Sequence, residues 1–82
     1  MRNENLELAR LRWQCRRGML ELDELLGRFL ENHYLTASPT EQALFKELLT
    51  HNDQDLFTWL MGHQPPTDAR FVALIQRIRT NA

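Results

Sequence analysis

Apolar residues recur along this chain at intervals of three and four positions, the spacing that gathers side chains on one face of an α-helix. The pattern is clearest between residues 19 and 34. There the stripe consists of Leu22, Leu25, Leu26, Phe29, Leu30 and His33. Acidic residues fill the first turn, where the helix dipole favours negative charge. We therefore predict a helix over residues 19–34.

Another helix is predicted before it, over residues 4–16. Its broad apolar face, with arginines between, consists of Leu6, Leu8, Ala9, Leu11, Trp13 and Cys15. Gly18 follows, and a glycine just beyond a helix commonly ends it in the left-handed conformation. We therefore expect a helix break with a positive φ at Gly18.

Capping signals predict two further helices. Residues 38–41, Ser-Pro-Thr-Glu, form a capping box before an apolar stripe of Leu44, Phe45, Leu48 and Leu49. Asn52 is expected to cap a shorter helix that ends near Gly62. Its buried side is predicted to consist of Leu56, Phe57, Leu60 and Met61. Trp59 is turned by roughly 100° from its neighbours, so we expect it at the edge of the core.

The last helix is predicted after the Pro65-Pro66 pair. Thr67 is expected to cap it, and Phe71, Ile75 and Ile78 recur at helical spacing and should face inward. No strand pattern or internal repeat is visible. The sequence therefore predicts an all-α fold, a compact five-helix bundle-like domain over residues 1–82 with its core at about 5–79.

Chain length and composition narrow the possible functions. Eighty-two residues can bury one small core but leave little room for a deep pocket, which disfavours an enzyme. A single cysteine and no visible secretory signal favour a reducing, cytoplasmic location. The longest apolar runs are far shorter than the ~20 residues that cross a bilayer. No heptad pattern is sustained, so we expect a monomer.

The formal net charge is −1, but the charged residues are distributed unevenly along the chain. Residues 1–18 hold five arginines against two acids, residues 19–62 hold eight acids against two cations, and residues 63–82 hold three arginines against one acid. The basic ends can lie against the acidic middle. The acidic middle also disfavours nucleic-acid binding, because it would repel a polyanion.

The titratable and nucleophilic residues show no catalytic or metal-binding arrangement. His33, His51 and His63 lie on different predicted elements without metal-ligand spacing. Cys15 stands beside two arginines that could lower its pKa, but no histidine base is near in sequence, so a buried role is favoured. The three isolated glycines form no phosphate-binding loop. We expect no metal, no cofactor held by this chain alone, and a protein as its partner.

Two blocks of sequence resemble a known family. The first is the run Trp-Gln-Cys-Arg-Arg-Gly-Met-Leu-Glu-Leu-Asp at residues 13–23, and the second is Asp-x-Asp-Leu-Phe-x-Trp-Leu at residues 53–60. With that order and separation they resemble the succinate dehydrogenase assembly factor family, over about residues 11–78. The family's arginine, glycine, x, x, glutamate signature falls on Arg17, Gly18 and Glu21.

The resemblance implies a cytosolic five-helix protein that binds the flavoprotein subunit of succinate dehydrogenase, and the related fumarate reductase subunit, and promotes covalent FAD attachment without forming the bond itself. It implies a contact surface of Arg17, Gly18 and Glu21, with Arg16 and Asp23 beside them. Trp59 is a further candidate for partner contact, because tryptophan is enriched in interface hot spots.

Two points stay open at this level. Some members of the family are labelled as antitoxins of a membrane-associated toxin, so an antitoxin or another regulatory helical binding protein is the alternative. The Arg17 to Glu21 junction could also be only a helix break. If it is a docking surface, we expect Arg17 and Glu21 to be exposed charges that add little to the free energy of unfolding.

Overall fold

The computed structural model describes the backbone of residues 2–80 and the side chains from residue 6 to residue 80. Five α-helices lie in this range, each where one was predicted, and no strand occurs among these residues. In chain order they are α1 (Arg2–Gln14), α2 (Leu20–Phe29), α3 (Pro39–Leu48), α4 (Asp53–Leu60) and α5 (Val72–Thr80). A π-helical turn, η1 (Leu30–Tyr34), continues α2, and a 3₁₀ turn, η2 (Ala69–Phe71), precedes α5.

The core lies where α2, α4 and α5 pack against one another, with α3 beside α5. Three phenylalanine rings at its centre, those of Phe29, Phe45 and Phe71, are almost completely inaccessible to solvent. Phe29 and Phe45 pack with ring centroids 4.9 Å apart. Aliphatic side chains surround these rings, and all of them except Leu74 belong to the predicted stripes: Leu22, Leu26, Leu30, Leu48, Leu49, Leu56, Leu60, Leu74, Ile75 and Ile78.

Local capping explains where α3, α4 and the 3₁₀ turn η2 begin. The hydroxyl of Ser38 accepts the backbone N–H of Glu41 at 3.1 Å, and the side chain of Asn52 accepts that of Asp55 at 2.8 Å, so both predicted caps are confirmed. The predicted cap at Thr67 is wrong. Asp68, in an extended conformation, accepts the N–H of Arg70 at 3.0 Å and starts the 3₁₀ turn instead.

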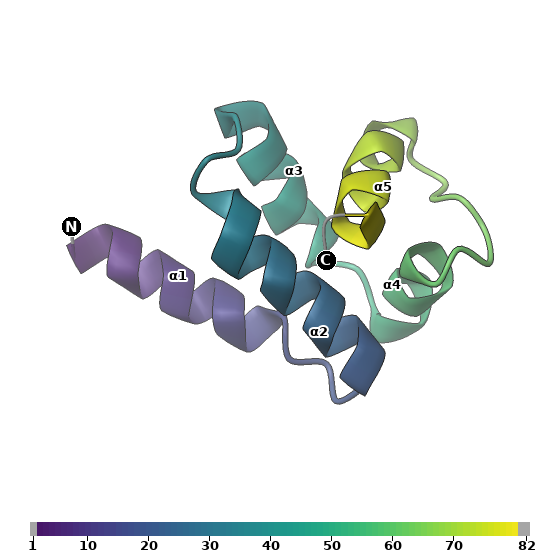
Figure 1. The fold of residues 1–82 in the computed structure, drawn as a ribbon, viewed down its shortest axis with the longest axis horizontal. Coiled ribbons are helices and arrows are strands. Elements are labelled where there is room, and N and C mark those ends of the chain that lie inside the picture. The colour runs from purple at the N-terminus through teal and green to yellow at the C-terminus, as the bar shows by residue number, and fades with distance from the viewer. Residues whose placement is uncertain (1, 81–82) are drawn as a thin grey trace.

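Helix α1 is attached at one side of the other helices, and Figure 1 shows its N-terminal end extending past them. Of its described side chains, Leu11 is buried in the core together with the adjoining Cys15, and Leu8 packs against the core but is only partly buried. The broad apolar face predicted for this helix is therefore only partly buried, because Leu6 is 60% exposed and Trp13 is 74% exposed. These two residues are seven positions apart and share the outward face.

Ion pairs supplement this apolar attachment. Glu7 of α1 lies 2.6 Å from the ammonium group of Lys46, and it also accepts a hydrogen bond of 2.8 Å from the hydroxyl of Tyr34. Arg12 lies 2.6 Å from Glu31. Both ion pairs are exposed to solvent, so each contributes little on its own. The apolar contacts of Leu8, Leu11 and Cys15, together with the loop after α1, therefore carry most of the attachment.

Candidate functional site

The junction between α1 and α2 is an extended loop over residues 15–19. Gly18 has a φ of +82°, which confirms the predicted left-handed conformation. It does not directly follow the helix, however, because α1 already ends at Gln14. The backbone N–H of Cys15 still donates to the carbonyl of Leu11 at 2.9 Å, and that of Arg16 donates to the carbonyl of Trp13 at 3.1 Å. The last turn of the helix therefore tightens before the chain leaves it.

Asp23 of α2 holds this loop. Its carboxylate accepts the backbone N–H of Arg17 at 2.7 Å and that of Gly18 at 3.3 Å. Met19, the residue before α2, makes no capping hydrogen bond with its side chain. Asp23, in the first turn of α2, therefore satisfies two backbone N–H groups that precede the helix. It was predicted to contact the partner, but its carboxylate faces the loop of its own chain.

Arg17 ties the same loop to the segment between α3 and α4. Its Nη1 atom donates to the carbonyl of His51 at 3.0 Å and lies 3.2 Å from Asp53 Oδ1, and its Nη2 atom donates to the carbonyl of Leu49. Its Nε donates to the carbonyl of Gln14 at 2.7 Å. The side chain is only 15% exposed.

The expectation that Arg17 is an exposed charge is therefore wrong. Its guanidinium satisfies backbone carbonyls from two distant parts of the chain, a tertiary arrangement that periodicity does not reveal. Of the predicted contact residues, Arg16, Gly18 and Glu21 are exposed. Neither Arg16 nor Glu21 has an ion pair or a side-chain hydrogen bond among the described side chains.

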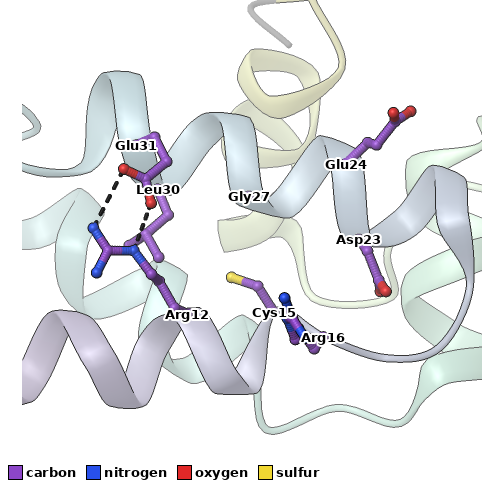
Figure 2. Close-up of a pocket in the computed structure, with 8 residues that line it drawn as sticks. All are labelled: Arg12, Cys15, Arg16, Asp23, Glu24, Gly27, Leu30 and Glu31. Carbon is purple, nitrogen blue, oxygen red and sulfur yellow. Dashed lines mark hydrogen bonds and ion pairs between the residues drawn. The ribbon is translucent and has the colours of Figure 1, made fainter.

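A groove of about 380 Å³ lies beside this loop, between the C-terminal part of α1 and α2. Figure 2 shows Gly27 on α2 facing Cys15 and Arg16 across it, with the Arg12–Glu31 pair at one end. Leu30, Asp23 and Glu24 complete its lining. The sequence analysis did not identify this groove. The one feature of the sequence that could have indicated it is Gly27, because glycine is unfavourable inside a helix.

The two tryptophans lie in opposite environments. Trp59 is only 6% exposed and packs against His51 and Phe71, with ring centroids 5.1 Å and 6.4 Å away. The prediction that it lies at the edge of the core is wrong, because α5 and η2 cover the side of α4 that the local pattern left open. Phe57, predicted as buried, is partly exposed instead. Trp13, two residues before the loop, is the tryptophan that solvent reaches.

Cys15 is a buried thiol, as its sequence context favoured. Burial raises the pKa of this thiol to about 12, and the positive charge of Arg17 only partly opposes the shift. At neutral pH it is therefore protonated and a poor nucleophile. Within the described residues, no three His, Cys, Asp or Glu side chains are arranged to hold a metal ion, and no helix is long and apolar enough to span a bilayer.

Comparisons with known proteins match the chain along nearly its whole length. Residues 9–82 match the family described as flavinator of succinate dehydrogenase. A protein of Coxiella burnetii named FAD assembly factor SdhE is 43% identical over 77 residues, 94% of either chain. Proteins of the same name are 51% identical in Legionella pneumophila strain Paris, over 77% of this chain and 80% of theirs, and 42% identical in Shewanella oneidensis, over 96% of each.

These matches include the junction and its supports. The 74 residues matched by the family begin within α1 and continue past α5, so they take in the loop, its tethers at Asp23 and Asp53, and the groove. With this coverage, the chain belongs to the succinate dehydrogenase flavinator family.

Proposed function

We propose that this protein acts in the cytoplasm as an assembly chaperone that binds the flavoprotein subunit of succinate dehydrogenase and promotes the covalent attachment of FAD to it. The family match over residues 9–82 carries the proposal. The related flavoprotein subunit of fumarate reductase is a second partner of the same kind. No described feature favours the antitoxin alternative.

A docking role for the junction is supported by its two kinds of residue: some hold the loop in place, and others present exposed charges. Arg17 and Asp23 fix the path of the loop from inside. Arg16 and Glu21 stand on the outside, exposed and without partners among the described side chains. A rigid loop that presents charges of both signs loses little conformational entropy on binding and can select a partner of complementary charge.

The flavin site belongs to the partner in this proposal. The lining of the groove beside the junction carries three carboxylates, of Asp23, Glu24 and Glu31, against the two guanidinium groups of Arg12 and Arg16, so it offers the diphosphate of FAD no excess of positive charge. The one thiol in the chain is protonated at neutral pH, so it does not offer a nucleophile. This chain therefore holds the flavoprotein in a competent arrangement, and groups of the flavoprotein form the bond.

Reconstitution tests the proposal. Purified apo flavoprotein subunit is incubated with FAD, with or without this protein, and covalent flavin is read as fluorescence of the denatured subunit on a gel. We expect this protein to increase the fluorescence. Equal flavin in the two reactions would overturn the proposal.

A matched pair of variants locates the effect. Glu21→Ala should lower covalent flavin without changing the melting temperature, because this carboxylate is exposed and has no partner among the described side chains. Glu47→Ala removes an exposed carboxylate of α3 that pairs with the exposed Arg70, and it should leave covalent flavin unchanged.

A further inference from the structure

Gly27 is not required by the packing of this chain. It lies within α2, where glycine is among the least favourable residues. A Cβ atom built on it would have no neighbour within 4 Å, apart from its own stretch of helix. Its φ is not positive either, since Gly18 and Gly62 are the glycines with positive φ in the described backbone. Alanine would therefore fit here and favour the helix, so packing within the described chain does not account for the glycine.

The space that Gly27 leaves open is the middle of the groove between α1 and α2. Cys15 and Leu30, which are 3% and 2% exposed, lie on either side of it, so the groove has an apolar floor. The Arg12–Glu31 pair closes one end, as Figure 2 shows. A volume of about 380 Å³ is enough for a single large side chain to enter from outside.

The charges around the groove indicate what accompanies that side chain. Arg12 is engaged with Glu31, and the carboxylate of Asp23 accepts the N–H groups of the loop. Glu24 points away from Cys15 and Arg16 in Figure 2. Arg16 is exposed and has no ion pair among the described side chains. Arg16 is thus the cation at the mouth of the groove that lacks an ion pair among the described side chains, and its guanidinium suits a carboxylate of the partner.

We propose that the groove between α1 and α2 receives an apolar side chain of the flavoprotein subunit over Gly27, and that a carboxylate next to it in the partner pairs with Arg16. This inference rests on the proposed function and adds the chemistry of the partner segment. Gly27 provides the depth, Cys15 and Leu30 provide the apolar contact, and Arg16 sets the orientation of the segment.

Variants that fill the groove test whether it receives an apolar side chain of the partner. The affinity of each variant for the purified flavoprotein subunit is measured by calorimetry, and its melting temperature by circular dichroism. Gly27→Leu should weaken binding at least about tenfold, because its side chain occupies the space of the incoming one. The control, Ala73→Leu, makes a small-to-leucine change at an exposed position of α5, a helix that does not line the groove, and it should bind like the parent.

Gly27→Ala keeps the test decisive if the leucine variant misfolds. Its single methyl group has room, so this variant should melt no lower than the parent and still bind several-fold more weakly. If Gly27→Ala, and a folded Gly27→Leu, bind with the affinity of the parent, the groove takes no partner side chain and the proposal is overturned.

Charge reversal at Arg16 tests the proposed pairing of this residue with a carboxylate of the partner. Arg16→Glu should weaken binding at least about tenfold and flatten its dependence on salt, because the variant repels the partner carboxylate. Arg79→Glu makes the same change on α5 and should leave the affinity and its salt dependence close to those of the parent. Equal losses in both variants would show an effect of net charge alone and would overturn the pairing at Arg16.

The parent protein separates this proposal from the function on which it rests. If the parent neither binds the flavoprotein subunit nor raises its covalent flavin, the proposed function fails. If the parent does both, and the Gly27 variants do so equally well, only the groove proposal fails.

Discussion

Arg17 Nη1 lies 3.0 Å from the carbonyl oxygen of His51, so the loop between α1 and α2 is hydrogen-bonded to a segment 34 positions later in the chain. The arginine of the family signature thus works as an internal tether. Loss of flavinylation on changing this residue would not show by itself that Arg17 contacts the partner. Stability and docking have to be measured separately at this position.

The first prediction concerns stability at Arg17. Arg17→Ala removes hydrogen bonds to the carbonyls of Leu49 and His51 and the ion pair to Asp53. We expect a loss of about 1–3 kcal/mol in the free energy of unfolding, the range for leaving such groups unsatisfied. Thermal unfolding should show a melting temperature lower by about 4–8 °C for each kcal/mol lost.

Arg16 supplies the control for that measurement. It is the neighbouring arginine, exposed and without an ion pair in the described structure, so Arg16→Ala should stay within about 0.5 kcal/mol of the parent. If both variants melt like the parent, the tether at Arg17 contributes nothing measurable and its contacts are incidental.

The second prediction concerns the backbone at Gly18. A Cβ atom there would meet no neighbour within 4 Å, so a side chain is opposed only by the left-handed backbone conformation. Gly18→Val should therefore cost about 1–2 kcal/mol in urea unfolding, the strain of a non-glycine residue at positive φ. Gly18→Asn should cost less, because asparagine tolerates this region better. Equal losses would argue against backbone strain as the cause.

The helices were predictable because their information is local. The stripe from Leu22 to Leu30 and the caps at Ser38 and Asn52 depend on neighbours within about one turn. The role of Arg17 was not predictable in this way. Its acceptors at Leu49 and His51 are backbone carbonyls, which every residue carries, so no residue type marks them in the sequence.

The candidate site was predicted in outline and differs in its details. The resemblance directed attention to the loop of residues 15–19, and the positive φ at Gly18 followed from the helix break. Periodicity within one helix could not show which residues face a neighbouring helix. The groove at Gly27 arises only when α1 packs beside α2, and the burial of Trp59 arises only when Phe71 covers it.

The third prediction concerns the thiol of Cys15. Burial raises its pKa to about 12, so it should react slowly with a disulfide reagent at pH 8 in the folded protein and rapidly in guanidinium. A free thiol has a pKa of about 8.5, and the folded state therefore binds the proton more tightly than the unfolded state. The stabilising contribution of this difference is complete below that pKa and is lost as the pH rises towards 12. Rapid labelling of the native protein would contradict the burial.

The last prediction separates the two tryptophans. Trp59→Ala removes a ring that is 6% exposed and packed against Phe71, and it should lower the free energy of unfolding by about 3–5 kcal/mol. Trp13→Ala removes a ring that is 74% exposed and should change stability by less than about 0.5 kcal/mol.

At a docking surface beside the loop, however, losing the Trp13 ring should weaken binding of the flavoprotein subunit by about 2 kcal/mol or more, as for tryptophan at hot spots. Chemical unfolding and calorimetry with the purified subunit measure the two effects. Unchanged binding by Trp13→Ala would place the partner on another face of the molecule.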